Sequence, residues 1–241
     1  MDIDFTAAKL ADCQKHGIQF SENMNCNISF ENLILFKKIF SELNINFILY
    51  FGTLLGFVRE GWFINYDLDT DVCCLNLSNI DIEKITKKAK SYHFDVLRKT
   101  PDIISFIRKG EYIDIYNFRT NDTDAKCIDY RVAVTDFCQT KKLRINGVSF
   151  DIPINAEISL EKLYGKNWRV PIANFHAPPT DANYQDRRHR YIIQLSSIGY
   201  IYIRKLRLTI KYKLPKIYAV FRHLRKVLTE LYQTLNLKNL K

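Results

Sequence analysis

The sequence predicts an α+β protein in which a mixed β-sheet is flanked by helices. Apolar residues recur at helical spacing in some segments, whereas other short segments alternate apolar and polar residues. The turn pairs Lys109-Gly110 and Asn146-Gly147 each separate two alternating segments, which is typical of hairpins. With 241 residues and 47% hydrophobic content, the chain can bury a substantial core.

Two longer helices are predicted from this periodicity. Residues 29–44 place Leu33, Phe36 and further apolar side chains on one face, after Ser29 as a capping residue. Residues 79–92 carry a Lys-rich exposed side. Two shorter helices are expected over residues 53–59 and 159–164, the second ended by Gly165.

The strands are predicted from alternation and from the turn signals between them. They are residues 45–50, 66–75, 94–98, 103–108, 112–119, 142–145 and 148–152. Because helices alternate with only some of these strands, we expect a mixed sheet with helices packed on it.

The net positive charge of the chain comes from its C-terminal part. Residues 187–241 hold 14 Lys and Arg against one acid, whereas residues 1–186 hold 22 basic and 25 acidic residues. We therefore expect a catalytic domain over residues 1–186 and a basic helical C-terminal extension over residues 187–241. From Pro215 onward, apolar residues line one helical face, so the extension is expected to end in a basic amphipathic helix.

Three partners suit this basic extension. A basic amphipathic helix binds an anionic membrane surface, which is the interpretation we favour. The same helix could pack on the body of the protein or on a second copy. Interleaved basic and tyrosine residues also suit nucleic acid, the least favoured of the three.

The six cysteines show no CxxC pair and no metal-finger spacing with histidine. We interpret them as small apolar side chains in a reducing compartment. The sequence lacks signal-peptide features at Met1, and no uncharged apolar run is long enough to span a membrane. A cytoplasmic protein is expected, with a peripheral association at the inner face of the membrane as a further expectation.

The most informative motif is three alternating acids, Asp67, Asp69 and Asp71. On a strand, every second side chain points the same way, so these carboxylates would share one face. Three like charges at that spacing call for compensation, and Mg²⁺ or Mn²⁺ bound by carboxylate oxygens is the ordinary solution. The alternative is a solvated acidic turn, which Val72 and the apolar residues after it disfavour.

Two further elements extend this motif into a site. Gly52 lets backbone approach a substrate, while Thr53 could cap the short helix and donate a hydrogen bond to a phosphate oxygen. Asp114 stands between two isoleucines in an otherwise apolar strand, so it should be partly buried. It could complete the metal site or act as a general base, and the alternative is a structural ion pair with a nearby arginine. A strand, Gly-Thr, a short helix and an acidic strand form the layout of nucleotidyltransferase-type folds.

These residues resemble the LicD family, over roughly residues 30–175. The motifs that carry the resemblance are Gly52-Thr53-Leu54-Leu55-Gly56, Arg59, Gly61, Ile64, Asp67-x-Asp69-x-Asp71, Ile113-Asp114-Ile115, and Leu160-Glu161-Lys162-Leu163-Tyr164-Gly165 with Trp168 and Pro171. The sequence departs from the family pattern at Asn65-Tyr66, where Pro-Trp is usual, and at Leu68, where a polar residue is common. Neither departure removes a carboxylate.

The resemblance implies a nucleotidyltransferase-like fold that moves a phosphorylated alcohol from a CDP-linked donor to a glycan hydroxyl. It implies Asp69 and Asp71 as the principal metal ligands, Asp114 as a further ligand, and Asp67 as part of the acidic set. Arg59 would contact the donor phosphate, unless it is simply solvated at the surface. Two other functions remain open: transfer of a nucleoside monophosphate, and a noncatalytic membrane-binding or nucleic-acid-binding module.

Overall fold

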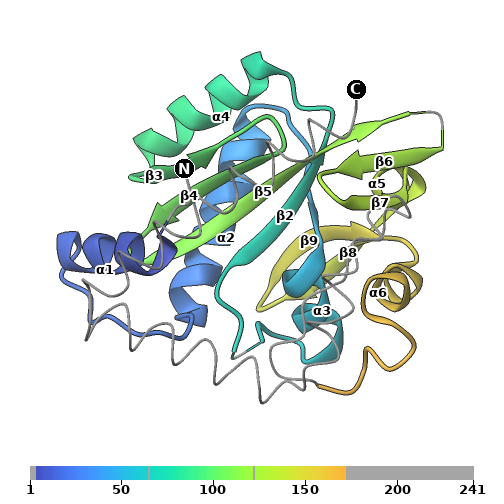
Figure 1. Ribbon diagram of the computed structural model, residues 1–241, viewed down its shortest axis with the longest axis horizontal. Helices are drawn as coiled ribbons and strands as arrows, with labels where there is room; N and C mark the ends of the chain where they lie inside the picture. The colour runs from blue at the N-terminus through green and yellow to red at the C-terminus, as the bar shows by residue number, and fades with distance from the viewer. Residues whose placement is uncertain (1–3, 65, 122, 172–241) are drawn as a thin grey trace, which may run out of the picture. The chain divides into compact units, whose positions relative to one another are not determined.

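The computed structural model describes residues 4–64, 66–121 and 123–171. Within them, a mixed sheet is flanked by helices, which confirms the predicted α+β class (Figure 1). The predicted basic extension, residues 187–241, lies outside the described residues.

The main sheet has the order β1-β2-β5-β4-β3, and β6 and β7 extend it from the end of β5. Its strands are β1 Ile48–Leu49, β2 Thr70–Leu75, β3 Asp95–Lys99, β4 Ile103–Arg108, β5 Glu111–Thr120, β6 Asp124–Cys127 and β7 Tyr130–Ala133. Only β2 and β5 pair in parallel among the described ladders. A separate hairpin consists of β8 Thr140–Ile145 and β9 Val148–Pro153.

Helices pack on the sheet and beside the separate hairpin (Figure 1). They are α1 Phe5–Lys15, α2 Cys26–Glu42, α3 Phe51–Arg59, α4 Asn79–Ser91, α5 Thr135–Cys138 and α6 Ala156–Tyr164. Helix α2 contacts β5, α4 contacts β3, and the two helices contact each other, so they cover one face of the sheet. Helix α3 contacts β2 and α6.

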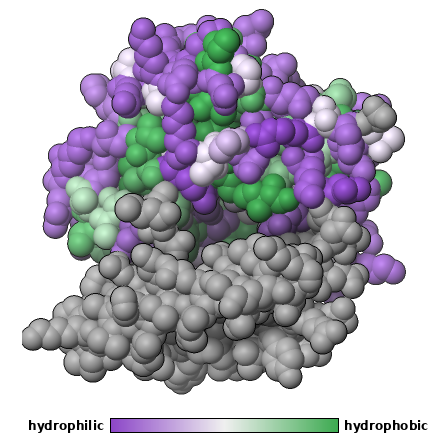
Figure 2. Space-filling view, turned by 45° about the horizontal axis from the view of Figure 1, so that its top comes forward, coloured by the Kyte–Doolittle hydropathy of each residue, from purple (hydrophilic) through white to green (hydrophobic). Residues whose placement is uncertain are grey.

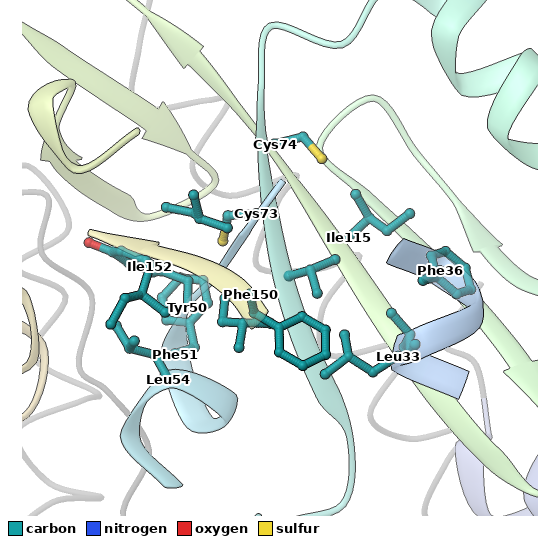
Figure 3. Packing of buried hydrophobic residues seen from close by; sticks show 14 of the residues in the cluster. Leu33, Phe36, Tyr50, Phe51, Leu54, Cys73, Cys74, Ile115, Phe150 and Ile152 are labelled. Carbon is teal, nitrogen blue, oxygen red and sulfur yellow. The ribbon is translucent and has the colours of Figure 1, made fainter. Parts of the chain in front are cut away.

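The core forms where α2 packs on the sheet. Figure 3 shows Leu33 and Phe36 of α2 beside Ile115 of β5, and all three are fully buried. In the same view Cys73 and Cys74, consecutive on β2, point to opposite sides of the strand. This alternation leaves the second face of β2 and β5 for other side chains, and the acids described below lie there.

The predicted hairpin turns are confirmed. Lys109-Gly110 joins β4 to β5, and Asn146-Gly147 joins β8 to β9. All four residues have positive φ, between +44° and +82°. Positive φ at both central residues defines the type I′ turn, whose twist suits adjacent antiparallel strands. The pairs Arg108 with Glu111 and Ile145 with Val148 close the two turns.

Several predicted boundaries are wrong. Strand β2 begins at Thr70 and not at residue 66, because the chain turns at Asp67, whose N–H donates to the Ile64 carbonyl. Helix α2 begins at Cys26, capped by Asn25, and the predicted cap Ser29 is buried inside it. Helix α3 begins at Phe51, so Thr53 lies within it and does not cap it.

Other elements differ in length or were not predicted. The strand expected over residues 45–50 is reduced to β1, and the helix over residues 159–164 begins earlier, as α6. Elements α1, β6, β7 and α5 were not predicted. In α1 the side chains of Lys9 and Asp12 are buried, so an apolar stripe does not mark its inner face.

Large apolar residues at the surface are scattered over several elements. Those with more than a third of their area exposed are Leu10, Ile34, Ile80, Ile128, Ile154, Ile158 and Val170, together with Tyr66. Figure 2 shows mainly hydrophilic residues over the described surface on that side, with smaller hydrophobic areas between them. Such scattered exposure is ordinary for a protein surface and needs no partner to explain it.

Gly56→Ala should destabilise the fold by about 1–3 kcal/mol, because a methyl group has no room there. A Cβ at Gly56 would lie 2.6 Å from the Trp62 carbonyl oxygen and 3.1 Å from the Ile64 nitrogen. Both are backbone atoms, so relief requires movement of the chain. Urea unfolding measures the loss, with the exposed substitution Lys87→Ala as the control. An unchanged unfolding midpoint for Gly56→Ala would contradict this packing.

Candidate active site

The strands β2 and β5 bring two acids side by side. Asp71 is the register partner of Asp114 in the parallel ladder, and both residues are buried, at 6% and 3% exposure. Their neighbours Val72 and Ile115 also pair, and they point into the core. The alternation of the two strands therefore places both carboxylates on the face opposite α2.

The start of α3 holds Asp71 in place. The Gly52 N–H donates to Asp71 Oδ2 at 3.1 Å, and the Asp71 N–H donates to Thr53 Oγ1 at 2.8 Å. An N–H from the first turn of a helix suits a carboxylate, because it has no partner within the helix and lies at the positive end of the dipole. Thr53 is buried and links α3 to β2, and its predicted contact with phosphate stays a prediction.

Asp67 and Asp69 come from the turn before β2 and not from the strand itself. Asp67 Oδ1 accepts the Leu68 N–H at 3.0 Å. A Cβ at Gly52 would lie 2.4 Å from Asp67 Oδ2 and 3.3 Å from Asp71 Oδ2. Glycine at this position therefore leaves the room in which the Asp67 and Asp71 carboxylates stand close to α3.

The four acids affect one another's protonation. Burial raises the pKa of Asp69 well above its usual range, and the charges of Asp71, Asp67 and Asp114 raise it further. Burial likewise raises the pKa of Asp71, together with the charges of Asp67 and Asp114, against the lowering effects of the Gly52 N–H and of Arg98. Burial raises the pKa of Asp114, although Arg98 and Ser105 partly offset it. The structure therefore brings all four predicted acids into one electrostatic cluster.

An arginine stands beside this cluster, as the ion-pair alternative for Asp114 anticipated. Arg98 Nη2 donates to Asp114 Oδ2 at 2.6 Å, while Asp114 Oδ1 is buried without a hydrogen-bond partner among the described residues. Arg98 was not predicted as a site residue, because its contact with Asp114 depends on how the strands pair.

Tyrosines also surround the acids, and none of them was among the site residues predicted from the sequence. Burial raises the pKa values of Tyr112 and Tyr116, and the charges of Asp69, Asp71 and Asp114 contribute. A signal was available, because Tyr112 and Tyr116 flank Asp114 at positions two residues away and so share its face of β5. Burial also raises the pKa of Tyr130 to about 12, with Asp71 contributing. For Tyr164, burial and the charges of Asp71 and Asp67 raise the pKa.

Arg59 lies at the opposite end of α3 from Gly52, about 10 Å along the helix axis at 1.5 Å per residue. Its side chain is 8% exposed and pairs with Glu60 at 2.6 Å. Arg59 Nη1 also donates to the Trp168 carbonyl at 3.2 Å. The alternative of a simply solvated arginine is therefore wrong, and the phosphate contact stays a prediction.

The donor atoms of the cluster suit a hard divalent cation. Carboxylate oxygens are the preferred ligands of Mg²⁺, and the unpartnered Asp114 Oδ1 is one such oxygen inside the protein. Within residues 4–64, 66–121 and 123–171, there is no group of three or more Asp, Glu, His or Cys side chains that could hold a metal ion. Mg²⁺ usually takes one or two carboxylates and completes its shell with water and substrate phosphate, so Asp69 and Asp71 fit such a site.

Comparison with protein families identifies the domain that carries this site. A family model described as LicD/FKTN/FKRP, nucleotidyltransferase domain, matches residues 44–163. The chain is a LicD-family protein. The matched residues contain every predicted site residue, namely Gly52, Thr53, Arg59, Asp67, Asp69, Asp71 and Asp114. The LicD domain indicates a transferase with a phosphotransferase-like or nucleotidyltransferase-like function.

Two solved structures of ANT(2'')-Ia are similar to this LicD-family protein. The solution structure of this antibiotic-resistance factor has a TM-score of 0.45 and 12% identity, over 87% of this chain and 99% of that chain. The crystal structure of ANT(2'')-Ia in complex with adenylyl-2''-tobramycin has a TM-score of 0.42 and 12% identity, over 76% and 97% of the two chains. No curated protein sequence matches this chain.

Asp69→Asn should stabilise the EDTA-treated LicD-family protein more at about pH 8 than at about pH 5. The folded-state pKa of Asp69 lies above its unfolded value of about 3.9, because of burial and the neighbouring acids. The contribution of such an acid to stability is most favourable below the unfolded pKa and is lost as pH rises through the folded pKa. Asn does not titrate and avoids this loss. Melting temperatures across this range test it, and a difference that does not grow with pH would contradict the raised pKa.

Proposed function

We propose that this LicD-family protein is a Mg²⁺- or Mn²⁺-dependent phosphotransferase that uses a CDP-linked donor. It moves a phosphorylated alcohol, of the phosphocholine, glycerol phosphate or ribitol phosphate type, to a hydroxyl of a bacterial surface glycan such as capsule or lipopolysaccharide. The observation that carries the proposal is the pairing of Asp71 with Asp114 beside Asp69, inside the matched domain. A cluster of acids in a phosphate-transferring family is suited to a metal-bound diphosphate.

In this mechanism Asp69 and Asp71 would hold the divalent cation, which would neutralise charge on the donor diphosphate when bound. The Gly52 N–H and the bond from Asp71 N–H to Thr53 keep the Asp71 carboxylate oriented. Asp114 Oδ1, which has no hydrogen-bond partner among the described residues, would serve as a further ligand or accept the proton of the acceptor hydroxyl. The hydroxyl then attacks the distal phosphorus in line, and CMP leaves.

The site of action that we propose is the inner face of the cytoplasmic membrane. Among the described residues, none of the helices is long and apolar enough to cross a membrane. The basic residues 187–241 suit an anionic lipid surface, where lipid-linked glycan acceptors are held. Loss of salt-sensitive liposome flotation on truncation after residue 186 would support this contact, and unchanged flotation would count against it.

Transfer of a nucleoside monophosphate is the second candidate, because the matching family model is described as a nucleotidyltransferase domain. The two reactions differ in the phosphorus that is attacked. Attack on the nucleotide-bearing phosphorus of a nucleoside triphosphate releases pyrophosphate, whereas attack on the distal phosphorus of a CDP-linked alcohol releases CMP. The acid cluster serves either reaction.

The released product therefore tests the proposal. The full chain is incubated with Mg²⁺ and, in separate reactions, with CDP-choline, CDP-glycerol, CDP-ribitol and the four nucleoside triphosphates. We expect Mg²⁺-dependent CMP release from one CDP-linked alcohol, which EDTA abolishes. Pyrophosphate release from a triphosphate would support the second candidate. Turnover that persists in EDTA would reject metal dependence.

A further inference from the structure

Arg98 reaches the acidic face of the sheet through a β-bulge. Val96 of β3 pairs with Phe106 of β4. Two residues later Arg98 pairs with Ser105, although a regular ladder would place it opposite Ile104. Bulges commonly redirect a side chain next to an active site, because one extra residue shifts the alternation of the strand. Here the shift brings Arg98 to the face of Ser105 and away from that of Ile104, which is buried in the core.

The pairing places four polar side chains in a row across the sheet. Arg98 of β3 is opposite Ser105 of β4, which is opposite Asp114 of β5, which is opposite Asp71 of β2. Register partners on adjacent strands stand about 5 Å apart, so each can contact the next. The row links the bulge directly to the candidate metal ligands.

The contacts in this row fix the Arg98 guanidinium at two points. Arg98 Nη2 donates to Asp114 Oδ2 at 2.6 Å, and Nε donates to Ser105 Oγ at 3.0 Å. The Phe5 ring of α1 lies 5.5 Å from the guanidinium carbon, at cation–π distance. Asp114 is thereby held through one oxygen, while its other oxygen, Oδ1, is buried and has no hydrogen-bond partner in the part of the chain that the structure describes.

We propose that Arg98 is a positioning residue that holds Asp114 by Oδ2 and directs Oδ1 to a divalent cation at Asp69 and Asp71. The inference rests on the proposed metal dependence and adds two groups to the site. One is Arg98, which follows the β-bulge, and the other is Phe5, which lies outside the matched residues 44–163. A planar guanidinium suits this role better than an ammonium group, because it can bind Asp114 and Ser105 at once in a fixed geometry.

The test is Mn²⁺ binding to the full chain, measured by isothermal titration calorimetry. The proteins compared are the wild type, Arg98→Lys, Asp114→Asn and the double variant. Arg98→Lys keeps the charge and loses the two-point hold, so a change in affinity reports geometry and not net charge. Arg119→Lys is the matched control, since the exposed Arg119 of β5 pairs with Asp102 away from the row. Circular dichroism melts check that each variant folds.

We expect Arg98→Lys and Asp114→Asn each to weaken Mn²⁺ binding by about tenfold or more, the usual effect of losing an orienting or ligating group. The double variant should bind no more weakly than Asp114→Asn, because Arg98 acts through Asp114. Wild-type affinity in folded Arg98→Lys or in Asp114→Asn would overturn the inference and leave metal dependence intact. Additive losses in the double variant would also overturn it. Absence of Mn²⁺ binding by the wild type would overturn both proposals.

Discussion

Asp71→Asn is expected to reduce metal-dependent transfer by about a thousandfold or more, while the protein stays folded. The carboxylate of Asp71 is one of two principal ligands that we propose for the cation, and a bound metal supplies several kcal/mol of charge stabilisation in such reactions. Asn keeps the size of the side chain, and its oxygen can still accept the Gly52 N–H. The loss should therefore fall on catalysis and not on the fold.

The measurement is Mg²⁺-dependent CMP release from the CDP-linked donor that the wild type uses, alongside a thermal melt. Asp151→Asn is the control, because Asp151 pairs with Lys142 on the separate β8–β9 hairpin and touches none of the cluster. It should retain wild-type turnover. If Asp71→Asn kept more than about a tenth of the activity, the assignment of Asp71 as a ligand would fail.

The parts of the fold that could be predicted are those encoded by local patterns. Lys109-Gly110 and Asn146-Gly147 specify type I′ turns by their conformational preferences, so both hairpins were found with nearly correct strands. Strand β2 was predicted too long, because alternation of Asp67 and Asp69 with their neighbours looks the same in a turn as in a strand. Helix α1 could not be predicted, because buried polar groups, and not an apolar stripe, attach it to the rest of the protein.

Those buried polar groups bind α1 to the turn between β4 and β5. Lys9 pairs with Glu111 at 2.9 Å, with both side chains less than 10% exposed. Asp12 Oδ2 accepts the Gly110 N–H at 2.7 Å. Such contacts join residues about a hundred positions apart. A sequence alone does not show which distant polar residues will meet, so this docking required the structure.

For the candidate site, too, some residues could be predicted from the sequence and others could not. The acids were found from the sequence, because carboxylates at alternate positions and inside an apolar strand are unusual enough to indicate chemistry. The order of the elements predicted that Gly52 belongs to the same site as these acids. The neighbour of Asp114 could be expected only as some arginine, because its identity depends on a bulge that shifts β3 by one residue against β4. Local motifs thus revealed the ligands, and the pairing of strands revealed what orients them.

Gly52→Ala should lower transfer by about 10- to 100-fold with little change in stability, in contrast to Gly56→Ala four residues later. The new Cβ would lie 2.4 Å from Asp67 Oδ2 and 3.3 Å from Asp71 Oδ2. Side-chain oxygens can move where backbone cannot, so the fold should tolerate the methyl group. Alanine also favours a helix over glycine by about 1 kcal/mol, which offsets part of the strain. The methyl group should therefore displace the carboxylates and leave the fold intact.

The two glycine variants should give opposite patterns when turnover and urea unfolding are measured together. Gly52→Ala should lose activity at a nearly unchanged unfolding midpoint, and it should bind Mn²⁺ more weakly. Gly56→Ala should lose stability, because Trp62 and Ile64 oppose its methyl group with backbone atoms. Full activity in Gly52→Ala would mean that Asp67 and Asp71 can function with their carboxylates displaced from α3. The close approach of Asp67 to Gly52 would then have no part in the reaction, and the expected loss of activity would be wrong.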